Sequence, residues 1–156
     1  MVFDRLDENA EALQRILSEI SFLGGFDGSE LRMVLGFMQA VRCEANEQII
    51  SKGDEPSHIF IIREGTVELR LADEERELMK RQFSVGDHFG EVAMLTLRNE
   101  SASFVALEAC EMIAFPRSAF YRLKSEHPEI FCRIVINIAR DLARKVQFSD
   151  DLMLRG

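Results

Sequence analysis

The chain has 156 residues, of which 47% are hydrophobic and 29% are charged. This length suits one compact domain, and so apolar a composition excludes a disordered segment. Nineteen basic and twenty-seven acidic residues give a net charge of −8, which repels phosphate backbones and argues against direct binding of nucleic acid. A small local basic pocket for a small anion remains compatible with this charge.

The cysteines and the hydropathy indicate where the protein works. Cys43, Cys110 and Cys132 are odd in number and far apart, and Met1–Ala10 lacks the apolar core of a secretory signal. We interpret the cysteines as reduced thiols of a cytoplasmic protein. No apolar run approaches the roughly 18 residues of a membrane span, so the sequence predicts none.

The first part of the chain has helical patterns, and we expect N-terminal helices within residues 1–37. Glu8–Phe22 carries apolar residues at the spacing i, i+3, i+4 and i+7, which is typical of an amphipathic helix. Gly24 and Gly25 then break the pattern. Ser29 is expected to cap a second, short helix.

Between residues 38 and 116 short β-type runs alternate with glycines. His58–Glu64 and Thr66–Leu71 flank Gly65, and this arrangement predicts a hairpin. Further strands are expected at Gln48–Ile50, Leu78–Phe83, Ser101–Ala106 and Cys110–Phe115. With about seven or eight strands in all, the pattern predicts a sandwich or a barrel-like roll.

Helical character returns over residues 117–156, where we expect the C-terminal helices. Ser118 is expected to cap one helix and Pro128 to begin another. The apolar stripe of the long last helix consists of Phe131, Ile134, Val135, Ile138, Leu142 and Val146. This stripe covers the β-structure, pairs with another copy, or does both. Because it continues beyond Ile138, we expect a homodimer through this helix, with an unidentified effector protein as the alternative partner.

The segment Gly86–Leu95 is a glycine-bracketed turn that leads into one short helical turn. Backbone N–H groups at such a helix start are unpaired and carry positive partial charge, which suits a phosphate. Glu91 in this segment can accept hydrogen bonds from a sugar hydroxyl. Ordinary turns show the same local pattern, so the wider context decides its meaning.

Phe89–Leu95, followed by Ser-Ala-Ser at 101–103 and combined with the helix–β–helix order and four turn glycines, resembles the cyclic nucleotide-binding domain family. The resemblance extends from about residue 22 to the C-terminus. It implies an α+β fold: a β-roll (double-stranded β-helix jelly roll) flanked by N-terminal helices and a long C-terminal helix. It also implies one domain over residues 1–156, a phosphate-binding cassette at 89–103, cAMP or cGMP as ligand, and no cofactor.

The family's functional positions can be placed on this sequence. The resemblance assigns the backbone of Gly90 to the phosphate and the carboxylate of Glu91 to the ribose 2′-hydroxyl. It assigns backbone N–H groups and packing to the two residues that follow. The predicted ligand-binding residues are Phe89, Gly90, Glu91, Val92, Ala93, Arg98, Ser101 and Ala102.

One position departs from the family, because Glu100 stands where the family has its phosphate-binding arginine. Losing that bond costs about 1.5–3 kcal/mol and a facing carboxylate adds about 1–4 kcal/mol, which together predict roughly hundred- to hundred-thousand-fold weaker binding. Binding is retained under two alternative interpretations: Arg98 reaches the phosphate through a rearranged loop, or the ligand has no negative charge at this position. In a third interpretation Arg98 and Glu100 form a solvated pair.

Two functional hypotheses follow from these residues. In the first, the chain is a regulatory sensor in which ligand binding at the cassette is coupled to the C-terminal helix. In the second, the cassette is degenerate and the domain serves dimerisation or protein interaction. A metal enzyme of the cupin kind would need clustered histidines, yet His58, His88 and His127 are isolated, so we predict no catalytic or metal-binding residues.

Overall fold

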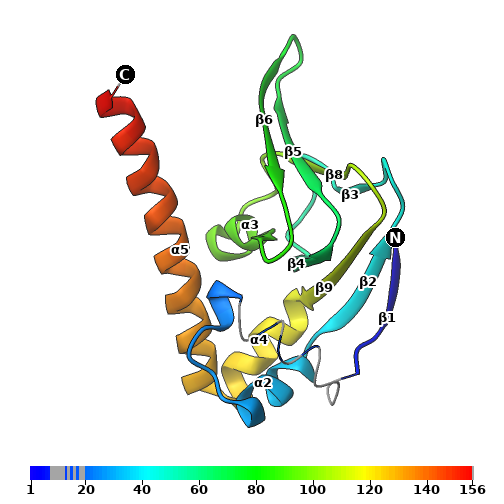
Figure 1. The fold of residues 1–156 in the computed structure, drawn as a ribbon, viewed down its shortest axis with the longest axis vertical. Helices are drawn as coiled ribbons and strands as arrows, with labels where there is room; N and C mark the ends of the chain where they lie inside the picture. The colour runs from blue at the N-terminus through cyan, green and yellow to red at the C-terminus, as the bar shows by residue number, and fades with distance from the viewer. Residues whose placement is uncertain (8–12, 14, 16, 18–19, 156) are drawn as a thin grey trace.

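The computed structural model describes residues 1–7, 13, 15, 17 and 20–155 (Figure 1). Its strands are β1 (Val2–Arg5), β2 (Gln39–Cys43), β3 (Gln48–Ile50), β4 (His58–Glu64), β5 (Val67–Ala72), β6 (Glu77–Phe83), β7 (His88–Phe89), β8 (Ser103–Ala106) and β9 (Cys110–Pro116). Its helices are the 3₁₀ turn η1 (Ser21–Leu23), α2 (Gly28–Leu35), α3 (Glu91–Thr96), α4 (Arg117–Glu126) and α5 (Pro128–Arg155).

The strands form two sheets, in the orders β1-β2-β9-β4-β7 and β3-β8-β5-β6. The neighbouring strands pair in an antiparallel manner. A phenylalanine-rich core packs within this β-structure, and a second core lies where the helices cover the first sheet. The two sheets with helices against one of them are the expected β-roll arrangement.

Strand β4 separates the two cores. Because successive side chains of a strand point to opposite faces, Ile59 and Ile61 belong to the core under the helices, whereas Phe60 and Ile62 belong to the core of the β-roll. All four are at most 1% exposed. A strand with both faces buried has a continuous apolar sequence, which explains the run from 59 to 62.

The hairpin predicted over His58–Leu71 is wrong, because β4 and β5 belong to different sheets. Gly65 between them has a φ of +94°, and a Cβ there would lie 2.6 Å from Sγ of Cys110. This glycine therefore carries the chain from one sheet to the other. The hairpin partner of β5 is β6, with Val67 opposite Phe83.

Two further observations concern the strands. Within residues 38–116 the structure describes eight strands, β2 to β9, at the upper end of the predicted number. The described residues also include β1, which lies within 1–37 where helices alone were expected. It pairs with β2 as Val2 opposite Arg42, so the edge of the first sheet is extended by the start of the chain.

The predicted helix over Glu8–Phe22 falls mostly outside the described residues. The next helix, α2, begins at Gly28 and is capped by Asp27, whose side chain accepts from the backbone N–H of Glu30. The carboxylate of Glu30 accepts from the backbone of Asp27 in return, so the cap is a capping box. The prediction of Ser29 as the cap is wrong, because its hydroxyl donates to the Asp27 carboxylate instead.

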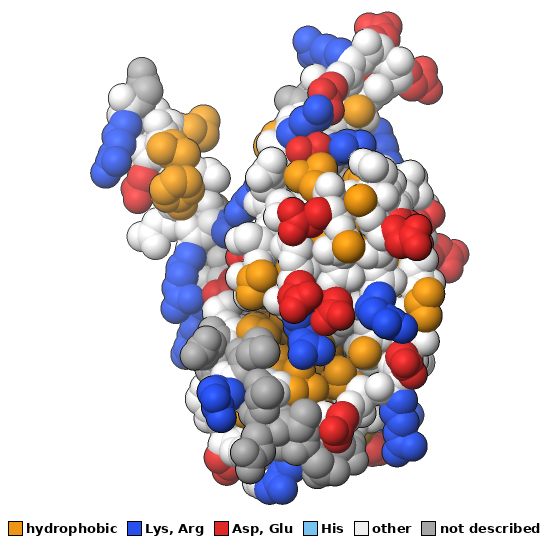
Figure 2. Space-filling model, turned by 45° about the vertical axis from the view of Figure 1, so that its right-hand side comes forward, with side chains coloured by type: hydrophobic (Ala, Val, Ile, Leu, Met, Phe, Trp, Pro, Cys, Tyr) orange, Lys and Arg blue, Asp and Glu red, His pale blue; other side chains and the backbone are white. Residues whose placement is uncertain are grey.

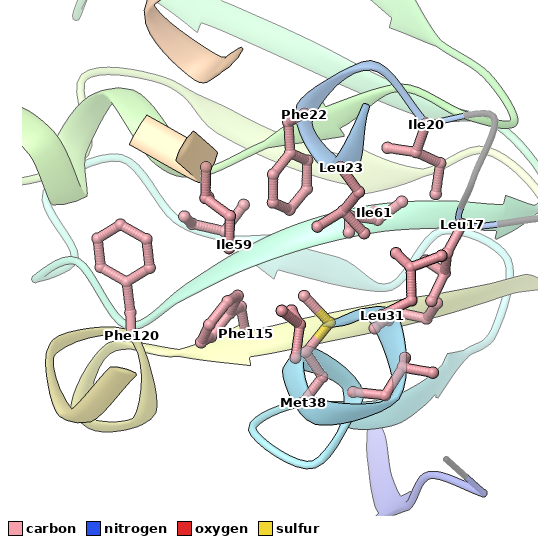
Figure 3. Close-up of a cluster of buried hydrophobic side chains, with 14 of the residues drawn as sticks. Leu17, Ile20, Phe22, Leu23, Leu31, Met38, Ile59, Ile61, Phe115 and Phe120 are labelled. Carbon is pink, nitrogen blue, oxygen red and sulfur yellow. The ribbon is translucent and has the colours of Figure 1, made fainter. Parts of the chain in front are cut away.

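Helices α4 and α5 follow β9 directly. The structure starts α4 at Arg117 after Pro116 with no side-chain cap, so Ser118 lies in the first turn and is not the predicted cap. Pro128 begins α5 as predicted. The side chains of α2, α4, η1 and β4 meet in the helical core shown in Figure 3, where Phe115 and Phe120 contact edge to face.

The two halves of α5 have different surroundings. Ile134 and Ile138 are fully buried in the helical core, and Nδ2 of Asn137 donates to the carbonyl oxygen of Phe22 at 3.1 Å. Toward its C-terminus the helix projects away from the body of the domain (Figure 1). Val146 is 62% exposed, and Figure 2 shows hydrophobic side chains gathered on this projecting end.

Among the described helices, none combines the length and the apolar character required to cross a membrane.

Candidate functional site

A pocket opens between the cassette, the second sheet and α5. Its volume is about 470 Å³, which is within the usual size of small-molecule sites. The residues that line it are Leu69, Arg81, Phe83, His88, Phe89, Gly90, Glu91, Val92, Ala93, Thr96, Arg98, Asn99, Glu100, Ser101, Ala102, Phe104, Leu142 and Lys145. The structure thus brings all eight residues predicted from the sequence to one pocket.

Near the start of the cassette, Gly90 directly precedes α3. Its φ is +93°, and a Cβ at this position would lie 2.4 Å from the carbonyl oxygen of His58. The chain therefore needs glycine here both for its backbone conformation and for the close approach to β4. This turn directs the start of α3, with its free N–H groups, to the pocket.

Phe89 holds the cassette to the β-roll core. Its ring stacks on those of Phe60 and Phe104, with centroids 5.2 Å and 4.7 Å away, and its side chain is 1% exposed. Aromatic pairs at such distances add to the energy of burial. Phe89 thus fixes the position from which the next residues reach the pocket.

The other predicted residues divide by exposure. Glu91, Ala93 and Ala102 are buried, and Val92 is 52% exposed although it lines the pocket. Arg98 and Ser101 are exposed as well. The pocket therefore combines fixed inner positions with an accessible rim.

Glu100 is buried at the pocket, with an exposed fraction of 8%. Its backbone is fixed, because its N–H donates to the oxygen of Asp54 and its oxygen accepts from the N–H of Gly53, both at 2.8 Å. Burial, followed by the charges of Glu91 and Asp54, raises the pKa of Glu100 from 4.5 to about 7. Glu100 is buried while Arg98 is exposed, and in the described part of the chain no ion pair joins them, so the interpretation of these two as a solvated pair is wrong.

Behind the cassette, His88 lies between two carboxylates. Its Nδ1 is 3.3 Å from Oε2 of Glu91, and its Nε2 is 3.1 Å from Oδ2 of Asp141 on α5. Oδ2 of Asp141 also accepts from the hydroxyl of Ser21. His88 and Glu91 are 4% and 3% exposed, whereas the side chain of Asp141 is 12% exposed, so the group links the buried side of the cassette to the partly exposed α5.

The electrostatics of this group favour the charged forms. Burial lowers the pKa of His88, but the nearby carboxylate of Glu91 and the hydrogen bond of Asp141 outweigh it, so the pKa is raised. Burial raises the pKa of Asp141, but the hydrogen bonds of Ser21 and His88 outweigh it and the pKa is lowered. In the described part of the chain no group of His, Cys, Asp or Glu side chains has an arrangement for a metal ion.

The sequence missed the part of the pocket formed by β6 and α5. The guanidinium of Arg81 lies 5.2 Å and Nζ of Lys145 lies 5.8 Å from the ring centroid of Phe83. Leu142 joins them from α5. A helix that folds back over the β-roll makes contacts that no local spacing signals, although Leu142 was already assigned to the apolar stripe.

This fold and pocket define a β-roll sensor domain with a glycine-led cassette and a covering helix. The model of the family "Cyclic nucleotide-binding domain" matches residues 40–127, more than half of the chain, and the chain therefore belongs to this family. The fold class and the family predicted from the sequence are confirmed.

Related proteins agree with this assignment. The chain is 28% identical over 116 residues to the cAMP-dependent protein kinase regulatory subunit of Yarrowia lipolytica, covering 74% of this chain and 30% of that protein. It is 30% identical over 117 residues to a lysophospholipase of Neurospora crassa, covering 73% of this chain and 7% of that protein. The chain thus spans less than a third of these relatives.

Solved structures show the same fold. A cyclic nucleotide-binding domain from Methylobacillus flagellatus has a TM-score of 0.80 at 23% identity, over 92% of this chain and 82% of that one. The regulatory subunit of a cAMP-independent protein kinase A from Trypanosoma cruzi, bound to guanosine, has a TM-score of 0.67 at 28% identity, over 78% and 42%. The chain is a regulatory domain of the cyclic nucleotide-binding type, from a generally non-catalytic family, and the matches do not favour the degenerate alternative.

Proposed function

We propose that the cassette pocket binds a nucleoside that has no phosphate charge at Glu100, and that its occupancy controls the position of α5. The observation that carries this proposal is the buried carboxyl group of Glu100 at the position where the family binds the phosphate. Leu142 and Lys145 of α5 line the same pocket, which supports a link between the ligand and this helix.

A cyclic phosphate meets two costs at this position. The missing arginine removes about 1.5–3 kcal/mol. Glu100 must also take up a proton to avoid repulsion, and with a pKa of about 7 this costs about 0.4 kcal/mol at pH 7 and about 1.4 kcal/mol at pH 8. At pH 8 the sum is about 3–4 kcal/mol, or roughly a hundred- to thousandfold in affinity.

A nucleoside avoids both costs. Its 5′-hydroxyl can donate to the Glu100 carboxylate or accept from the protonated acid, while the ribose hydroxyls remain available to Glu91. The aromatic rings of Phe83, Phe89 and Phe104 contribute to an apolar lining for a planar base. The guanosine-bound kinase subunit of similar fold supports this class of ligand.

The test is calorimetry at about pH 8 with guanosine, adenosine, cAMP and cGMP. The wild type is expected to bind a nucleoside and to bind cyclic nucleotides at least about a hundredfold more weakly than Glu100→Arg does. Glu108→Arg makes the same charge change at an exposed site away from the pocket lining and serves as the control. Micromolar binding of cAMP by the wild type, without nucleoside binding, would contradict the proposal.

We further propose that the whole chain acts as one non-catalytic domain of the cytoplasm and pairs with a second copy through the projecting end of α5. Its free cysteines support a reducing compartment. The apolar residues Val146, Phe148 and Leu152 are 52–64% exposed there, and burial against a copy would remove them from water. Sedimentation is expected to show a dimer that Phe148→Glu dissociates. A chain that remains monomeric at all concentrations would refute the homodimer, whether or not it then binds an effector protein.

A further inference from the structure

The contacts of His88 point to a connection between the cassette and α5. The imidazole, on β7, has a carboxylate at each of its two nitrogens: Glu91 from α3 and Asp141 from α5. A neutral imidazole has one N–H and one lone pair, so one of the two carboxylates would then face a lone pair. Both contacts are favourable in the imidazolium form alone, which carries an N–H at each nitrogen and a positive charge between the two carboxylates.

We propose that protonated His88 is the positioning residue that holds α5 on the cassette, and that α5 is released from Asp141 onward when His88 loses its proton. The link to the ligand rests on the proposed function, because Glu91 is there the contact of the ribose. The pH dependence of the helix itself requires no ligand.

The surroundings of His88 favour this role. Phe22 of η1 places its ring edge to face at a centroid distance of 5.4 Å, and Ile61 of β4 is its partner across the strands. Neither residue can titrate. Two further charged residues lie near this group. Lys145 lowers the pKa of His88, and the guanidinium nitrogen Nη1 of Arg144 lies 3.1 Å from Oδ1 of Asp141.

The C-terminal half of α5 has few buried side chains that hold it on the domain. Ile138 is the last fully buried residue of the described helix, Leu142 is partly buried, and Val146 is exposed. Asp141 lies at this boundary, where it also accepts from Ser21. Loss of the contact with His88 therefore acts at the point where the helix leaves the body of the domain.

The direction of the pH effect follows from the pKa of His88. The hydrogen bond of Asp141 is one of the causes that raise the pKa of His88, so this pKa is higher with α5 docked than with α5 released. Docking is therefore favoured at acidic pH, weakens by up to about tenfold per pH unit between the two pKa values, and is lost above the higher one. A hydroxyl that donates to Glu91 weakens its attraction for the imidazolium, so ligand binding releases a proton and loosens α5.

The test uses ligand-free protein with a single tryptophan. The chain has no tryptophan, and Ser149 lies in a groove that also includes Arg81 of β6 and is not among the residues of the proposed dimer contact, so Ser149→Trp reports on the position of α5. Emission is followed from about pH 5.5 to 9, in this background and with His88→Gln or Asp141→Asn added. His127→Gln, at a histidine remote from the pocket lining, is the control, and Glu100→Gln removes a second group of the pocket, whose pKa of about 7 lies in the same range.

The expected result is a transition in emission within this pH range, with the docked form at the acidic end, which is kept in the His127 and Glu100 variants and lost in the His88 and Asp141 variants. An NMR titration of the His88 ring in the wild type and in Asp141→Asn supplies a second measurement, with a lower pKa expected in the variant. Emission that does not change with pH, or an unchanged transition in Asp141→Asn, would overturn the proposal. Because no ligand is present, a failure to bind nucleosides leaves this result unaffected.

Discussion

Replacement of Glu100 by glutamine should stabilise the domain at alkaline pH but not at acidic pH. The folded protein raises the pKa of this carboxyl group from 4.5 to about 7, chiefly by burial and then through Glu91 and Asp54. This difference corresponds to about 3 kcal/mol between the two protonation states. Glutamine has nearly the same shape and carries no charge, so it avoids that cost.

The sign follows from proton binding. Between pH 4.5 and 7 the folded protein retains the proton of Glu100 while the unfolded chain has lost it, so stability falls as the pH rises through this interval. Above 7 the penalty is fully present. Glu100→Gln should therefore change the free energy of unfolding little below 4.5 and raise it by up to about 3 kcal/mol at about pH 8.

Urea denaturation at several pH values measures this difference directly. Glu108→Gln removes an exposed carboxylate away from the pocket lining, and its effect should be small at every pH. A Glu100→Gln effect of equal size at acidic and alkaline pH would refute the reasoning, because it would show that the carboxyl group is not desolvated in the folded protein.

Two other variants test the backbone and the helix. Gly90→Ala should destabilise the protein by about 1–3 kcal/mol or more, because its Cβ would meet the carbonyl oxygen of His58. The loss should exceed that of Gly86→Ala, whose Cβ would meet nothing within 4 Å. Equal losses of the two variants in thermal or urea unfolding would contradict the clash. Ile138→Ala should cost about 2–5 kcal/mol and Val146→Ala within about 0.5 kcal/mol; a large loss at Val146 in a monomeric preparation would show that the end of α5 packs on its own domain.

The sequence predicted those features that depend on neighbours along the chain. The cassette was placed because glycine and glutamate at 90 and 91 have roles set by the local turn. Pro128 was placed as a helix start because its ring fixes φ and its missing N–H is tolerated there. The cap at Asp27 was within reach too, since Asp27 and Glu30 have the spacing of a capping box.

Features that depend on residues far apart in the chain could not be predicted from the sequence. The pattern of alternating residues around Gly65 fits a hairpin, but strand partners are chosen by the two sheets as wholes, and β4 pairs with β9 about fifty residues later. Asp141 carries no local mark of its contact with His88, because α5 must first be packed through Ile134 and Ile138 before the two side chains meet.

The pKa values of Glu100 and His88 both depend on the carboxylate of Glu91. Glu91 contributes to the raised pKa of each, by repulsion in the first case and by attraction in the second. Negative charge added near Glu100, as by a cyclic phosphate, therefore favours protonation of both groups and holds α5 more firmly. A neutral nucleoside that donates to Glu91 has the opposite effect on His88. Under the proposed function, glutamate in place of the family's arginine at position 100 would change the class of ligand and, through Glu91 and His88, the direction in which the ligand moves α5.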